Sequence, residues 1–325
     1  MILLTGGTGF VGSHVLERLR ADGAPVRCLV RPKAGRAPDA GLPGGAEIVA
    51  GDLETGAGLQ EALDGVETVI HLAGVTKAVT GKEYYAGNVR ATANLLLAMA
   101  GSDARLVHVS SLAAVGPAES ATRPVDENTE PHPLTHYGKS KLEGERLVRA
   151  SRPDAVIVRP PVVYGPRDRD VLQILKPVAK GWALEMRGGE RWVSVIYVGD
   201  LAAGLACLAA SQAGAGRTYY LAHQEPVSWS GLAAAAARIM GVRLRTVRIP
   251  TWAARTVGAC AEAWSYAAGQ PSIISREKVA EGLCAAWTCD ASRARAELGF
   301  RAPTDLERGL AETLAWYKEA GWLSY

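Results

Sequence analysis

The stretch that decides the fold is Thr5-Gly6-Gly7-Thr8-Gly9-Phe10-Val11-Gly12, which follows a short apolar run and opens an amphipathic segment. Glycines at this spacing permit a tight turn, close approach of the backbone to a pyrophosphate, and close packing of a helix on a strand. The helix that follows would offer unpaired N–H groups and a partial positive charge to the phosphates. An ordinary glycine turn is the alternative. We expect a dinucleotide to contact Gly6, Thr8, Gly9, Phe10, Val11 and Gly12.

Short apolar runs alternate with amphipathic stretches through the first half of the chain, a pattern typical of parallel strands joined by crossover helices. The expected strands are 1–5, 25–30, 47–50, 68–72, 106–110 and 155–159. The expected helices are 10–21, 59–63, 83–99 and 136–150. The connection 32–45 is rich in Pro, Gly and Ala and is expected to be exposed.

The pattern loosens in the second half, where short strands are expected at 192–197 and 217–221. Helices are expected at 171–180, 201–210, 229–240, 251–268 and 304–320. The sequence therefore predicts an α/β fold, a Rossmann-type doubly wound parallel sheet with a smaller, mostly helical carboxy-terminal part. Residues 1–165 would form the dinucleotide-binding domain. Residues 166–325 would mainly bind substrate, with some segments returning to the Rossmann core.

Composition excludes several classes of function. The 36 basic and 33 acidic residues give a net charge of +3, too small to indicate nucleic-acid binding. The five cysteines show neither a paired framework nor zinc spacing, so we expect reduced thiols in the cytoplasm and no metal site. The most apolar segment, 249–268, is interrupted by Pro250, Arg255 and Glu262, which argues against a membrane span.

The end of the second expected strand indicates which cofactor is bound. An acidic residue there would bind the adenosine ribose hydroxyls of NAD, but Arg31 occupies this place and no carboxylate is near it in the sequence. A guanidinium can hold a 2′-phosphate through two charge-assisted hydrogen bonds. NADP(H) is therefore favoured, NAD(H) is possible, and a solvated arginine is the alternative. Asp52 could accept from the adenine amino group or cap a helix, and its position leaves both open.

The candidate catalytic residues are Ser111, Tyr137 and Lys141. Tyr137 and Lys141 are four residues apart and so share one face of a helix, where an ammonium would favour the phenolate and lower the pKa of the tyrosine. Ser111 closes the fifth strand, where strand ends line a ligand crevice. Taken singly, Tyr137 and Lys141 could be ordinary surface residues of a helix, and Ser111 could simply favour a turn. A glycine loop, a serine-ended strand and a Tyr/Lys helix in this order favour catalysis.

With these features the sequence resembles the extended short-chain dehydrogenase/reductase family along essentially its whole length. The marks are 5–12, 51–53, 71–74, 87–89, 110–111, 137–141, 159–166 and 198–202. The resemblance implies that Ser111 donates to the substrate oxygen, that Tyr137 is the acid/base, and that Lys141 is its pKa partner and a ribose contact. It also implies that Asn88 is mainly structural and that the cofactor lies along Asp52, Leu53, Ala73, Gly74, Pro160 and Val163.

Within the family the sequence is most similar to the dihydroflavonol reductase and 3β-hydroxysteroid dehydrogenase branch, through Arg31, the 109–117 strand ending and the 287–323 tail. This resemblance implies hydride transfer between NADP(H) and a ketone, aldehyde or alcohol on a mainly apolar small molecule. Segment 250–268 would wall that pocket, or would be a plain packing helix. Homodimers through the Tyr137 helix are common in the family.

Two other functions remain open. Nucleotide-sugar epimerases or dehydratases usually carry an asparagine where Val162 or Val163 stands, so this reading is weakened without being excluded. A non-catalytic redox sensor that binds NADP(H) would typically have lost the tyrosine or the lysine, and both are present.

Overall fold

The computed structural model describes residues 1–32, 45–272 and 274–325. The exposed connection predicted at 32–45 lies almost wholly outside the described residues.

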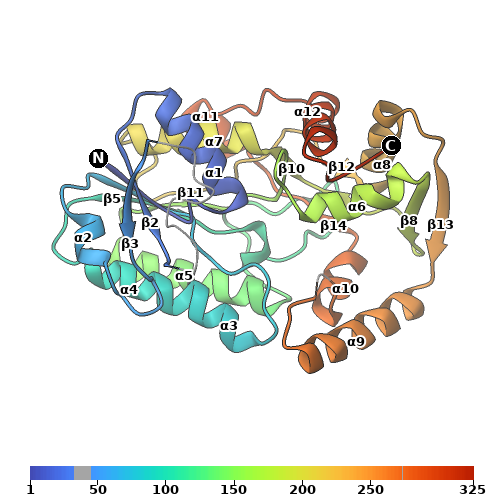
Figure 1. Cartoon of the computed structure of the whole chain (residues 1–325), viewed down its shortest axis with the longest axis horizontal. Coiled ribbons are helices and arrows are strands. Elements are labelled where there is room, and N and C mark those ends of the chain that lie inside the picture. Colours follow the sequence, from blue (N-terminus) through green and yellow to red (C-terminus); the bar gives the residue numbers. More distant parts are fainter. Residues whose placement is uncertain (33–44, 273) are drawn as a thin grey trace.

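The centre of the molecule is a seven-stranded parallel sheet with the order β11-β6-β5-β4-β1-β2-β3 (Figure 1). Its strands are β1 Ile2–Thr5, β2 Val26–Val30, β3 Glu47–Ala50, β4 Thr68–His71, β5 Arg105–Val109, β6 Val156–Val158 and β11 Thr218–Tyr219. The strand order reverses between β1 and β4, and ligands of open parallel sheets bind outside the carboxyl ends of the strands at such a point. The predicted Rossmann-type fold is confirmed.

Helices cover both faces of this sheet because its strands are apolar on both sides. Figure 1 shows α1 (Phe10–Ala21) and α7 (Val198–Ala210) on one face. On the other face lie α2 (Leu59–Leu63), α4 (Ala91–Ala98) and α5 (His136–Ser151). Each face has its own buried cluster, around Leu16 and Leu205 on the first and around Leu95 and Leu106 on the second.

The prediction of one regular α-helix at 83–99 is wrong. The structure has α3 (Gly81–Tyr85), a π-helical turn (Ala86–Arg90) and α4, which follow one another without a break. The reason lies in Asn88, whose side chain bonds both backbone groups of Val75, Oδ1 accepting from the N–H at 2.7 Å and Nδ2 donating to the carbonyl at 3.0 Å. Drawing this residue inward inserts the extra residue of a π turn, a feature often found at functional sites.

The single strand predicted at 192–197 is two strands that belong to different sheets. β9 (Trp192–Val193) pairs with β12 (Val227–Ser228) and β14 (Ala286–Trp287), whereas β10 (Val195–Tyr197) pairs with β7 (Val162–Tyr164). The change occurs at buried Ser194, which donates its N–H to Trp287 and accepts from Val162. Sequence periodicity carries no sign of such an exchange of partners.

The carboxy-terminal part forms a second core beyond the edge of the main sheet. Its helices α6 (Asp170–Ala179), α8 (Trp229–Met240) and α12 (Leu306–Glu319) pack around buried Leu175, Leu232, Leu310 and Leu314. A two-stranded ribbon of β8 (Trp182–Met186) and β13 (Arg245–Ile249) leads into α9 (Thr251–Ala268), which packs on α10 (Arg276–Leu283) (Figure 1). The sequence did not predict β8, β13 or α10.

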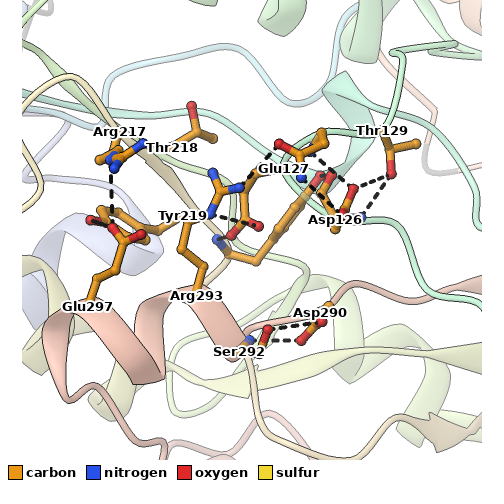
Figure 2. A network of polar contacts seen from close by, with 12 residues as sticks. Asp126, Glu127, Thr129, Arg217, Thr218, Tyr219, Asp290, Ser292, Arg293 and Glu297 are labelled. Atoms are coloured by element: carbon orange, nitrogen blue, oxygen red, sulfur yellow. Dashed lines mark hydrogen bonds and ion pairs between the residues drawn. The ribbon is translucent and has the colours of Figure 1, made fainter.

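A polar network fastens the long segment after β5 to the sheet edge (Figure 2). Arg293, on α11 (Ser292–Leu298), pairs with the buried Glu127 carboxylate at 3.5 Å. The Tyr219 hydroxyl on β11 donates to Glu297 of the same helix at 2.7 Å. Burial raises the pKa of Glu127, so its charge depends on these partners. The network holds the segment that begins with Ser111 against the sheet.

A buried ion pair joins α5 to β6. The Arg159 guanidinium donates to both Glu145 carboxylate oxygens, from Nε at 2.9 Å and from Nη2 at 2.6 Å, and both side chains are buried. Such a pair is costly to break, because the remaining charge is left without a partner in a medium of low polarity.

We expect Glu145→Ala to lower the free energy of unfolding by about 3–5 kcal/mol, measured by urea denaturation. The control is Glu143→Ala on the same helix, whose exposed pair with Arg146 should contribute less than about 1 kcal/mol. Equal losses in the two variants would contradict the assigned role of the buried pair.

Candidate functional site

The loop between β1 and α1 has positions at which only glycine fits. Gly6 has a φ of +76°, and a Cβ there would lie 2.7 Å from the backbone N of Ala73. A Cβ on Gly12 would lie 2.1 Å from the Gly6 carbonyl oxygen. The loop is therefore pressed against both the first turn of α1 and the end of β4.

This loop fits a phosphate. α1 begins at Phe10 behind Gly9, which contributes no side-chain cap, and its first turn carries no acidic residue. The helix end can thus offer its N–H groups and partial positive charge to an anion. Thr8 and Gly9 are exposed beside it, and Phe10 and Val11 are half-buried.

The segment after β4 forms the other side of the crevice. The Ala73 N–H donates to Thr5 Oγ1 at 3.2 Å, which ties the ends of β1 and β4 together. A Cβ on Gly74 would lie 2.8 Å from Asn88 Oδ1, so this backbone also runs close to its neighbours. Asn88 Nδ2 donates to Ser140 Oγ on α5 at 2.9 Å, which links the crevice to the tyrosine helix.

Arg31 lies at the end of β2, but it has acidic neighbours that the sequence did not reveal. Its Nη2 lies 2.9 Å from Glu54 Oε1 and 3.3 Å from Asp52 Oδ1. Arg90 approaches the other Glu54 oxygen at 3.2 Å. Two guanidinium groups therefore converge on one carboxylate at the edge where the adenosine end of a dinucleotide would lie.

The alternative role of Asp52 as a helix cap is wrong. The cap position of α2 is held by Gly58, while Asp52 Oδ1 accepts from the Glu54 N–H at 2.8 Å and so closes a turn. Leu53 is buried, and its carbonyl accepts from Asn94 at 2.8 Å.

Two elements, β5 and α5, bring Ser111, Tyr137 and Lys141 together. Ser111 follows β5, its Oγ accepts from the Ala113 N–H at 3.1 Å, and its hydroxyl lies near the Tyr137 phenol. Thr135 caps α5 by accepting from the Gly138 N–H at 3.1 Å, which fixes the turn that carries Tyr137. Burial raises the pKa of Tyr137, and the nearby Ser111 hydroxyl opposes that rise.

Lys141 lies one turn further along α5, with its Nζ donating to the Val109 carbonyl at 2.7 Å. Burial lowers the pKa of Lys141 to about 8, while Glu145 opposes the shift. The Glu145–Arg159 pair therefore lies directly behind the candidate catalytic lysine. Ser110, the neighbour of Ser111, is buried.

The cation that lowers the pKa of Tyr137 in this structure is Lys278 on α10. This helix is attached to the start of α5: Glu277 accepts from the His136 N–H at 3.0 Å and Glu281 accepts from the Thr135 hydroxyl at 3.2 Å. Sequence reasoning missed Lys278, because it lies in an ordinary charged helix with no motif around it.

Pro160 and Val163 lie where β6 passes into β7. The Pro160 carbonyl accepts from the Leu112 N–H at 2.9 Å, which places it beside the turn that follows Ser111. Val163 is half-buried against the core of the main sheet.

A cavity of about 1200 Å³ lies in the carboxy-terminal part. Its walls are mostly apolar and include Ile174, Val178, Met186 and Trp229. Gly282 of α10 also lines it, one helical turn from Lys278, so α10 connects the cavity with Tyr137. Among the described residues that line it, none comes from 250–268, so that segment does not wall this cavity.

The family model described as "NAD dependent epimerase/dehydratase family" matches residues 2–222. The chain belongs to this family. The ceramide reductase of Caulobacter vibrioides is 33% identical over 323 residues, which are 99% of this chain and 96% of that protein. An N-acetyl-α-D-glucosaminyl-diphospho-ditrans,octacis-undecaprenol 4-epimerase of Escherichia coli O157:H7 is 28% identical over 97% of this chain and 94% of that protein.

A solved structure, MoeE5 in complex with UDP-glucose and NAD, has a TM-score of 0.77 and 26% identity, and the match covers 98% of this chain and 99% of that one. Together these likenesses identify the chain as a nicotinamide-dinucleotide-dependent enzyme of the extended short-chain dehydrogenase/reductase type. In the described part of the chain, no helix is long and apolar enough to cross a membrane, and no cluster of side chains suits a metal ion.

A buried histidine beneath the site makes stability depend on pH. His71 is held between the hydroxyls of Thr5, at 2.8 Å, and Thr92, at 3.0 Å, and burial lowers its pKa to about 3. Because the unfolded chain binds a proton near pH 6.5 and the folded chain does not, stability is lost as the pH falls below that value.

Between pH 7.5 and pH 5 this histidine alone should remove about 2 kcal/mol from the free energy of unfolding. We expect the loss, measured by urea denaturation at the two pH values, to be smaller by that amount in His71→Phe. If wild type and variant lose the same free energy, the neutral state assigned to His71 is incorrect.

Proposed function

We propose that the protein is an NADP(H)-dependent oxidoreductase that interconverts a ketone or aldehyde with an alcohol on a mainly apolar small molecule. The observation that carries the proposal is the placement of three groups at the carboxyl edge of the sheet: the Ser111 hydroxyl at the end of β5, the Tyr137 phenol beside it, and Lys141 one turn further along α5, with its Nζ on the Val109 carbonyl at 2.7 Å. Two hydroxyls on one side of the crevice can both reach the same substrate oxygen.

A nicotinamide cofactor held along the β1–α1 loop would supply a hydride to the carbonyl carbon or, in the reverse direction, take one from the carbinol carbon. The Ser111 and Tyr137 hydroxyls donate to the carbonyl oxygen and polarise it, and Tyr137 passes its proton to that oxygen as the alcohol forms. Lys141, with a pKa of about 8, can hold or release a proton near neutral pH, and Lys278 is the cation that favours the phenolate that remains. In the reverse direction Tyr137 takes the proton from the alcohol.

An apolar substrate is supported by the walls of the cavity and by the likeness to a ceramide reductase. The likeness to an undecaprenol-linked 4-epimerase favours a second candidate, epimerisation of a sugar nucleotide or sugar lipid. The two differ in outcome, because a reductase consumes the nicotinamide cofactor whereas an epimerase returns the hydride to its product. A redox sensor would show neither reaction.

From the family resemblance we also propose a cytoplasmic homodimer that pairs through α5.

We expect Tyr137→Phe to lower the turnover of long-chain ketones and aldehydes with NADPH by about 10²-fold or more, because the proton donor is lost. NADPH consumption follows the reaction, and nucleotide fluorescence checks that NADPH still binds. The control is Tyr85→Phe, an exposed tyrosine on α3 that should leave turnover unchanged. Equal turnover in wild type and Tyr137→Phe would contradict the mechanism, and epimerisation without consumption of cofactor would favour the second candidate.

The NADP(H) preference is supported by the two arginines, Arg31 and Arg90, that share Glu54. An exposed pair of this kind contributes little stability, so a 2′-phosphate can displace the carboxylate and bind both guanidinium groups.

We expect Arg31→Ala to weaken NADPH binding about tenfold or more and to leave NADH binding nearly unchanged. Glu54→Gln should act in the opposite direction and strengthen NADPH binding, because it removes the competing negative charge. Titrations followed by nucleotide fluorescence measure both. Tighter binding of NADH than of NADPH by the wild-type protein would refute the preference.

A further inference from the structure

Helix α9 is attached to the rest of the protein by a narrow strip of small residues. Of its 18 residues only Ala254, Gly258 and Ser265 are buried. A Cβ on Gly258 would lie 2.8 Å from Val279 Cγ2, so α9 and α10 touch most closely at this point. The spacing of the three buried residues places them on one side of the helix and leaves the remaining circumference uncovered.

The uncovered side of α9 is apolar, the reverse of an ordinary surface helix. Trp252 is 71% exposed, Val257 53%, Trp264 74% and Tyr266 57%. Arg255 and Glu262 are the two charged residues of the helix, and the Glu262 carboxylate accepts from the Arg276 N–H at 2.9 Å. Exposed tryptophans on one helix mark an interaction surface.

Most of the charged residues in the chain segment that contains this face are positive. Residues 241–276 contain five arginines, at positions 243, 245, 248, 255 and 276, and one glutamate, Glu262, which gives a local charge of +4 in a chain whose total is +3. Arg243, Arg245, Arg248 and Arg255 are exposed. A partner for this face should therefore be both apolar and negatively charged.

We propose that α9 binds the surface of an anionic lipid bilayer. Its exposed tryptophans and tyrosine would enter the boundary between headgroups and acyl chains, the position that such side chains prefer, while the arginines would contact acidic headgroups. A second copy of the chain fits less well, because a two-fold interface would place two copies of the same positively charged patch against each other.

The position of α9 next to the cavity connects membrane binding with access of a substrate to the cavity. The chain lines the cavity at Arg248, just before α9, and again at Ile274, just after it. A helix held at the bilayer would therefore place the cavity rim next to the lipid phase. The surface needs no catalytic residue, so the proposal stands apart from the proposed reaction and is tested without it.

The test is sedimentation of the full-length protein with vesicles of phosphatidylcholine, with and without phosphatidylglycerol. We expect binding to the vesicles that contain phosphatidylglycerol, weakened by salt. The double variant Trp252→Ser/Trp264→Ser should lose at least about tenfold in affinity. Arg255→Gln should lose about fivefold on the anionic vesicles.

The matched control is Leu97→Ser, which removes a side chain that is 75% exposed on α4 and should leave vesicle binding unchanged. NADPH binding by every variant shows that the fold is intact. Absence of wild-type binding, or equal binding by wild type and the double tryptophan variant, would overturn the proposal. So would sedimentation velocity in which the wild type self-associates and the tryptophan variant does not, because a second copy would then occupy this face.

Discussion

The close approach of the β1–α1 loop to the end of β4 is the constraint on which the site depends. At Gly6 and Gly12 there is no room for a Cβ, because the loop backbone touches Ala73 on one side and its own helix on the other. The contact lies where the strand order reverses, so it opens a crevice between the two halves of the sheet and directs the end of α1 into it. Thr5, hydrogen-bonded to both His71 and the Ala73 N–H, joins the two strands.

A second set of contacts positions the reactive groups against this crevice. Asn88 reaches from its π turn to Val75 and Ser140, and the Glu145–Arg159 pair joins α5 to β6 behind Lys141. These are buried polar contacts, which are costly to leave unsatisfied, so they fix one position of α5 against the sheet. Catalytic positioning and stability therefore rest on many of the same residues.

Sequence reasoning predicted the parts of the molecule that local patterns determine. The alternation of apolar runs and amphipathic stretches predicted six strands of the central sheet, and the 217–221 run predicted the seventh. These strands could be predicted because the apolar residues that make each of them a strand lie within its own short segment. It failed where contacts between residues far apart in the sequence determine the local structure. The π turn follows from the contacts of Asn88 with Val75, and the break at Ser194 follows from an exchange of strand partners. Lys278 comes near Tyr137 because α10 docks on α5. The partners of Arg31 were missed in the same way, since Asp52 and Glu54 meet it only across β2 and β3.

The central claim is that a hydride leaves the cofactor and remains on the carbinol carbon of an apolar product. The most direct measurement is to supply NADPH deuterated at the transferable position together with a long-chain ketone, and to locate the deuterium by mass spectrometry. We expect deuterium on the carbinol carbon of the product, in a ratio of one to each NADPH consumed. Deuterium that stays with the cofactor while a sugar substrate is epimerised would contradict it.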